Sequence, residues 1–253
     1  MPRLLAFLIV LTGLAQPLSG ALAPAFGIGT PIGDATAGLD MPEQPLPAFF
    51  SIWSVIFAAY TAFGVAALIR PPAWLLRFGP ALLVAGVFNI VWMLSAQLIA
   101  SQVLDLVLLT PIIAASWYAA RIAAKLNASG ERGLTFRFAE AASGLLAGWI
   151  TVATAISLPL LVRSLTSLGP SDHPWPMVWT TLITAGLFAW LYTRFISPAL
   201  WYFIAAGWGL LGIAFHNWLE TGMHLVGHIA AFVLILLLLW RLTQGAKLAR
   251  QLA

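Results

Sequence analysis

The segment from His216 to His228 carries three histidines and one glutamate at intervals of four residues: His216, Glu220, His224 and His228. Imidazole and carboxylate groups bind zinc or iron, and this spacing places side chains on one face of an α-helix. A metal site would require one unbroken helix. Thr221-Gly222 interrupts the segment, however, and glycine commonly ends a helix. We therefore expect two helices with hydrogen-bonded histidines, and as alternatives a pH-responsive or ligand-contacting role or a metal site.

The composition indicates an integral membrane protein. The 253 residues are 61% hydrophobic and 8% charged, whereas soluble domains contain about 25% charged residues. Cysteine is absent, which excludes disulfides, thiolate metal sites and cysteine nucleophiles. The sequence also lacks a glycine-rich phosphate-binding loop and a Ser-His-Asp arrangement that could lie on one side of a membrane. It therefore offers no recognisable catalytic site.

Apolar runs of about 20 residues predict the architecture. They are continuous rather than alternating, which favours helices over the strands of a barrel. The runs are Leu4–Ala23, Phe49–Ile69, Ala81–Ala100, Gln102–Ala124, Phe138–Val162, Trp175–Thr193, Pro198–Trp218 and His224–Trp240. We expect an all-α bundle of about eight transmembrane helices.

The first run, after Met-Pro-Arg, also has features of a secretory signal peptide. Cleavage after Ala23 would leave Pro24 at the new N-terminus, which is unfavourable for the peptidase. We therefore expect this run to be retained as the first helix of the bundle.

The positions of the charges predict the orientation. With a cytoplasmic N-terminus, eleven of the twelve basic residues fall on the cytoplasmic side and only Arg163 falls outside. The eleven are Arg3, Arg70, Arg77, Arg121, Lys125, Arg132, Arg137, Arg194, Arg241, Lys247 and Arg250. Basic residues concentrate on the cytoplasmic side of membrane proteins. We expect both termini in the cytoplasm, in a bacterial inner membrane, and the basic composition does not indicate a nucleic-acid partner.

Two clusters of aromatic and polar residues lie within the second and third runs. Trp53, Phe57 and Tyr60 are spaced to form one stripe on a helix. Asn89 and Trp92, three residues apart, share a helix face. An amide in hydrocarbon needs a hydrogen bond, so Asn89 should face the bundle interior, either toward a ligand or toward a neighbouring helix.

The fifth run carries small residues and one large ring. Gly144 and Gly148 form a surface that another helix can approach closely, and Trp149 lies one turn from Ala153 on a shared face. In the fourth run, Asp105 lies near the outer end, where a carboxylate at a helix N-terminus is favoured. We expect Asp105 to cap that helix.

In this order and on these spans, the clusters resemble the tryptophan-rich sensory protein family, the TspO/MBR group that includes the mitochondrial translocator protein. Its motifs of a Trp-rich second helix, an Asn followed by Trp in the third, and a Trp followed by a small residue in the fifth are matched by Trp53, by Asn89 with Trp92, and by Trp149 with Ala153. Phe-Ser-Ile-Trp-Ser-Val-Ile-Phe and the segment 199–214 look like a longer bacterial branch with extra C-terminal helices.

The resemblance implies a five-helix core over residues 1–163 and a C-terminal three-helix extension over residues 164–253, in a bundle that is often a homodimer. It implies a pocket for a planar hydrophobic ligand, a tetrapyrrole such as protoporphyrin or haem, or a sterol, with no cofactor required. The residues expected to contact the ligand are Phe50, Trp53, Phe57, Asn89, Trp92, Trp149 and Ala153. The first loop, which covers the pocket in the family, lacks the Trp-Tyr and Trp-x-Pro-Pro pattern, and Ser157 replaces the Asn that is usual in the short branch.

These features favour a membrane sensor whose partners are the lipid bilayer and a small hydrophobic ligand. A transporter or trafficking factor is the alternative, and an enzyme that degrades tetrapyrroles is a further one. Transport is disfavoured because we find no inverted repeat and almost no ionisable residue near mid-membrane that could couple to an ion gradient.

Overall fold

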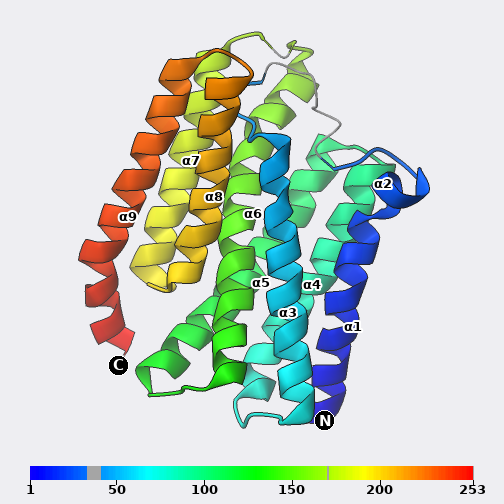
Figure 1. Ribbon diagram of the computed structural model, residues 1–253, viewed down its shortest axis with the longest axis vertical. Coiled ribbons are helices and arrows are strands. Elements are labelled where there is room, and N and C mark those ends of the chain that lie inside the picture. The colour runs from blue at the N-terminus through cyan, green and yellow to red at the C-terminus, as the bar shows by residue number, and fades with distance from the viewer. Residues whose placement is uncertain (33–40, 170, 253) are drawn as a thin grey trace.

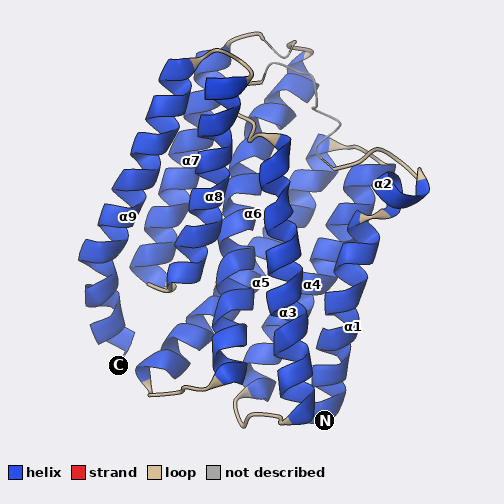
Figure 2. Cartoon of the chain, in the orientation of Figure 1, coloured by secondary structure: helices blue, strands red, loops and turns tan. Residues whose placement is uncertain are grey.

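The chain folds into a bundle of long helices (Figure 1). The structure, a computed structural model, describes residues 1–32, 41–169 and 171–252, with side chains up to residue 243. These residues contain helices and loops but no strand (Figure 2). The helices are α1 (Pro2–Gly20), α2 (Leu22–Phe26), the 3-10 helix η2 (Pro47–Ser51), α3 (Ile52–Ile69), α4 (Leu75–Leu98), α5 (Gln102–Ala128), α6 (Leu134–Thr166), α7 (Pro174–Phe195), α8 (Leu200–Leu219) and α9 (His224–Leu252). The prediction of an all-α membrane protein is confirmed.

Within the described residues, each of the predicted runs corresponds to one long helix. The helices alternate in direction, so both chain termini lie at the same end of the bundle (Figure 1). Six helical segments are long and apolar enough to cross a membrane: α1, η2 with α3, α4, α5, α6 and α9. The helices α7 and α8, with 22 and 20 residues, have a similar length.

The first helix is packed into the bundle. It contacts α3 and α4, and the side chains of Ala6, Ile9 and Gln16 are fully buried. A Cβ atom added to Gly13 would lie 3.1 Å from the Cα atom of Thr61 on α3, so this glycine permits close approach of the two helices. Its packing supports retention of α1, which stays a prediction.

Helix α6 lies between the N-terminal and the C-terminal helices of the bundle. It packs against α3 and α5 and also against α7 and α8. Gly144 and Gly148 face α8: a Cβ atom at position 144 would lie 2.7 Å from the Cβ atom of Trp201, and one at position 148 would collide with the backbone oxygen of Tyr202. The predicted close approach of a helix to these glycines is therefore confirmed, and α8 is the helix that uses it.

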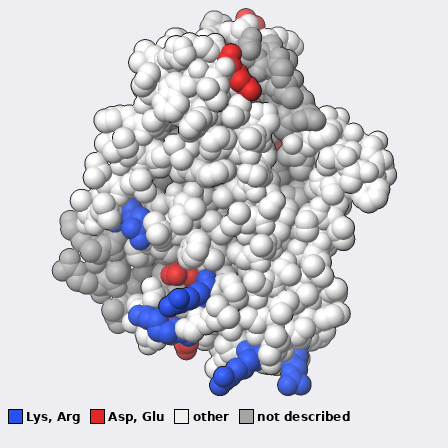
Figure 3. Space-filling view, viewed as in Figure 1, with Lys and Arg blue, Asp and Glu red and all other residues white. Residues whose placement is uncertain are grey.

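Most of the charged side chains visible in Figure 3 lie toward the two ends of the bundle, with the basic ones toward the end that holds the N-terminus. Arg163, at the opposite end, has a structural role. Its Nε atom lies 3.1 Å from Oε1 of Glu43, and the two side chains are only 6% and 0% exposed. Arg163 also donates to the backbone oxygens of Gly169 and Asp172. This buried ion pair fastens the first loop to α6.

Candidate ligand-binding cavity

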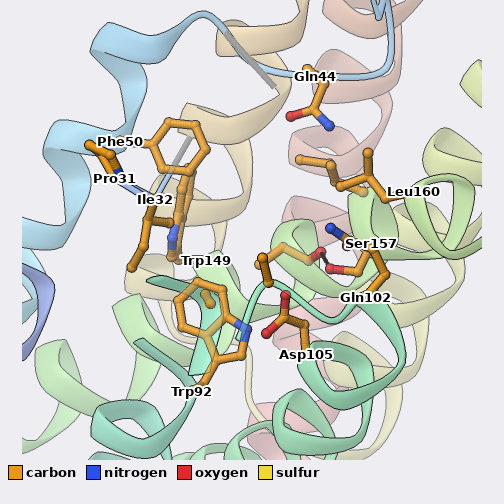
Figure 4. Close-up of a pocket in the computed structure, with 14 residues that line it drawn as sticks. Pro31, Ile32, Gln44, Phe50, Trp92, Gln102, Asp105, Trp149, Ser157 and Leu160 are labelled. Carbon is orange, nitrogen blue, oxygen red and sulfur yellow. Dashed lines mark hydrogen bonds between the residues drawn. The ribbon is translucent and has the colours of Figure 1, made fainter. Parts of the chain in front are cut away.

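A cavity of about 110 Å³ lies toward the end of the bundle opposite the two chain termini, and Figure 4 shows the residues that line it. Its walls come from α4, α5 and α6, from η2 and from the described parts of the first loop. The residues that line it are Pro31, Ile32, Gln44, Phe50, Trp92, Ala96, Ala100, Gln102, Asp105, Trp149, Ala153, Ile156, Ser157 and Leu160. Residues from segments far apart in the sequence thus meet around one space.

Aromatic rings form one side of the cavity. Phe50 packs edge-on against Trp149 with ring centroids 5.6 Å apart. Behind them, Trp53 contacts Trp149 at 6.1 Å and Trp92 at 5.9 Å and stacks on Phe57 at 5.4 Å. These separations lie in the range of favourable aromatic pairs. Three helices and η2 therefore build one connected cluster, and its members Trp92, Trp149 and Phe50 border the cavity.

The structure divides the predicted ligand contacts into three groups. Phe50, Trp92, Trp149 and Ala153 line the cavity. Trp53 and Phe57 instead line a neighbouring groove of about 570 Å³, which residues of α1, α3 and the first loop border and which Phe50 also borders. Asn89 lines neither space.

Asn89 connects two helices. Its side chain is fully buried, and Nδ2 donates to Oε1 of Gln16 on α1 at 2.8 Å. This is the structural alternative that the sequence left open, a hydrogen bond to a neighbouring helix. The geometry thus places Asn89 among the residues that hold α1 to α4, outside the walls of the cavity.

The cavity and the groove are separated by a thin partition. Pro31, Ile32 and Phe50 line both spaces. Pro31 and Ile32 belong to the first loop, so the described part of this loop contributes to the wall of the cavity.

The opposite side of the cavity is polar, and the sequence interpretation missed it as a ligand surface. Gln102, Asp105 and Ser157 lie on this side in Figure 4. The hydroxyl group of Ser157 donates to the backbone oxygen of Ala153 at 2.8 Å. The sequence does contain one indication of this polar surface: Gln102 and Asp105 are three residues apart, which places both on one helix face.

The expectation that Asp105 caps α5 is wrong. The N-cap residue is Ser101, whose hydroxyl group accepts a hydrogen bond from the backbone N–H of Leu104 at 3.4 Å. Asp105 is 8% exposed, and its Oδ1 atom has no hydrogen-bond partner among the described residues. Its carboxylate borders the cavity instead.

The histidine segment is broken as predicted. Helix α8 ends at Leu219, Gly222 has a φ angle of +71°, and α9 begins at His224. His216 and Glu220 thus belong to one helix, and His224 and His228 to the next. In the part of the chain that the structure describes, no group of three or more His, Asp or Glu side chains could hold a metal ion.

Two of the three histidines, His216 and His228, make hydrogen bonds through their rings. Nδ1 of His216 donates to the backbone oxygen of Gln44 at 2.8 Å, and Nε2 lies 3.3 Å from Oε2 of Glu220. Nδ1 of His228 lies 2.6 Å from the backbone oxygen of His224. Because Gln44 lines the cavity, His216 helps to hold part of the cavity wall in place.

A model of the TSPO-like protein family matches residues 5–243 of the chain. The chain belongs to this family. The match extends from α1 into α9, so the first five long helices and the three C-terminal helices of this TSPO-like chain both fall within it. No curated protein and no solved structure matches the chain. The resemblance inferred from the tryptophan clusters is confirmed, whereas the ligand contacts stay predictions.

Proposed function

We propose that this TSPO-like protein is a membrane sensor that binds a planar hydrophobic ligand in the cavity at its outer end. The observation that carries the proposal is the connected aromatic cluster that borders this cavity. Trp149 and Trp92 are only 2% and 7% exposed, yet both line the cavity. Binding sites of this kind are mostly apolar and aromatic with a few polar groups, and aromatic faces stack well on flat rings.

The volume of the cavity limits the size of the ligand that it can hold. Pockets for drug-sized ligands have volumes of about 300–1,000 Å³, and this cavity has about 110 Å³. It admits a small ring system as it stands. A tetrapyrrole such as protoporphyrin requires the partition of Pro31, Ile32 and Phe50 to open into the groove of about 570 Å³.

The donor set favours a metal-free ligand over haem. Haem iron takes an axial ligand from His, Cys, Met or Tyr, and none of these residue types lines the cavity. Haem confined to the cavity would receive no axial ligand from the lining residues, and Met93 is the one residue of these types that lines the groove. The residues present therefore fit a planar organic ligand better than an iron porphyrin.

The packing below the cavity supports binding rather than passage. Toward the end with the two termini, Leu109 and Ile112 of α5 and Leu145 of α6 are 0–1% exposed and belong to one core cluster. A ligand in the cavity would meet this packed layer instead of a continuous path. A sensor is favoured over a transporter for this reason.

We further propose that the membrane is a bacterial inner membrane and that both termini face the cytoplasm. The basic residues support this orientation, because they gather toward the end of the bundle that holds the N-terminus (Figure 3), and such residues concentrate on the cytoplasmic side. A homodimer stays a prediction.

Titration of the purified protein in detergent with protoporphyrin IX should quench tryptophan fluorescence and saturate near one ligand per chain. Trp149→Phe should weaken binding roughly tenfold, because the smaller ring removes part of the aromatic wall. Trp190→Phe is the matched control, since Trp190 is 42% exposed on α7 and lies outside the cavity.

The same titration separates the candidate functions. A stable ligand absorption spectrum supports a sensor, whereas a spectrum that decays with time would indicate an enzyme. Accumulation of the ligand inside proteoliposomes would indicate a transporter. Quenching that fails to saturate, or that Trp149→Phe and Trp190→Phe affect equally, would contradict binding in this cavity.

A further inference from the structure

The first turn of α5 brings a buried carboxylate to the cavity. Asp105 is 8% exposed, and its Oδ1 atom has no hydrogen-bond partner among the described residues. Its carboxylate points into the cavity in Figure 4. A buried polar atom without a partner is costly. Asp105 is therefore positioned to accept a hydrogen bond from a bound ligand.

The charges around Asp105 leave this carboxylate without compensation. The ionic groups of the neighbouring loop and α6, Glu43 and Arg163, pair with each other at 3.1 Å. No ion pair involves Asp105 within the described residues. One positive charge on a bound ligand would neutralise the charge of the Asp105 carboxylate.

The wall that faces Asp105 suits the rest of such a ligand. Phe50 and Trp149 lie on the other side of the cavity from Asp105 in Figure 4, and the ring of Trp92 lies next to the carboxylate. Aromatic rings stack on a flat apolar body, and their faces also attract a cation. A carboxylate on one side and aromatic rings on the other are the two features that recognise an organic ammonium group attached to a ring.

We propose that the cavity selects an arylalkylamine: a flat body of one or two rings with a protonated amine on a short alkyl arm that pairs with Asp105. The inference rests on the proposed function and narrows its ligand class. The volume of about 110 Å³ accounts for the small ring system. The carboxylate of Asp105 explains why the ligand should carry a positive charge. An apolar cavity without a carboxylate would disfavour a charged ligand.

Two probes of the same shape test the charge. The amine 2-naphthylmethylamine is cationic at neutral pH, and 2-naphthylmethanol is neutral with the same ring and nearly the same length. Calorimetric titration of the full chain in dodecyl maltoside should show the amine binding at least about tenfold more tightly, because hydrogen bonds between charged groups are the strong ones. Asp105→Asn should abolish this preference and leave the affinity for the alcohol unchanged.

A control variant and the neutral alcohol probe distinguish loss of charge recognition from loss of the cavity. Glu131→Gln removes a carboxylate in the loop between α5 and α6, which lies outside the cavity, and it should keep the preference for the amine. Saturable binding of the alcohol to Asp105→Asn reports an intact fold and cavity. Equal binding of both probes to the unaltered protein, or a preference that persists in Asp105→Asn, would overturn the amine proposal alone. Failure of both probes to bind would overturn the proposed function with it.

Discussion

Arg163→Met should lower the free energy of unfolding by about 3–5 kcal/mol, the usual cost of removing one partner of a buried ion pair. Glu43 is fully buried, and Arg163 is the basic group that pairs with it. Methionine keeps much of the apolar length of the side chain but leaves this carboxylate without a counter-ion. The variant also loses the hydrogen bonds to the backbone oxygens of Gly169 and Asp172. Thermal unfolding in detergent, followed by circular dichroism, measures the effect.

Two further variants identify the cause. In Glu43→Gln/Arg163→Met both charges are absent, and much of the lost stability should return, because neutral replacement of a whole buried pair is often tolerated. Arg70→Met removes an exposed arginine at the other end of the bundle and should have little effect. A single Arg163→Met variant as stable as the unaltered protein would show that the ion pair does not hold the first loop.

Gly148→Ala should also destabilise the bundle, by about 1–3 kcal/mol. The added methyl group would collide with the backbone oxygen of Tyr202, and a backbone atom inside a helix cannot move aside as a flexible side chain can. The expected consequence is that α6 and α8 separate slightly, which also disturbs the contacts that α8 makes with the first loop. A lower unfolding temperature and broader elution in size-exclusion chromatography would report it.

Gly186→Ala is the matched control for this substitution. Gly186 lies within α7, and a Cβ atom there would meet no atom within 4 Å. Alanine has the higher helix propensity, so this variant should be as stable as the unaltered protein or slightly more stable. Equal behaviour of the two variants would contradict the close approach of α6 to α8.

Features that repeat along one helix could be predicted from the sequence. The apolar runs predict each long helix, because membrane-spanning segments must satisfy their own backbone hydrogen bonds. The spacing of Gly144 and Gly148 predicts a close helix contact, and Gly222 predicts the break between α8 and α9. Each depends on local conformation or on one helix surface alone.

Features that depend on two helices or on a loop could not be predicted. Asn89 had to face inward, but its partner Gln16 follows from the rotation of α1 relative to α4. Arg163 and Glu43 are 120 residues apart, and no periodicity connects them. The position of Asp105 near a helix end suggested a cap, because the sequence does not show that Ser101 already has that role.

The most direct test of the central claim is to fill the cavity from one wall and measure binding of 2-naphthylmethanol by calorimetry. Ala153 lines the cavity on α6, and Ala153→Leu would occupy part of its volume of about 110 Å³. Ala58→Leu places the same side chain on an exposed position of α3 and serves as the control. We predict saturable binding to the unaltered protein and to Ala58→Leu, and a loss of at least about tenfold in Ala153→Leu, equivalent to about 1.4 kcal/mol, with an unchanged circular dichroism spectrum. Equal binding to all three proteins would show that the ligand lies elsewhere.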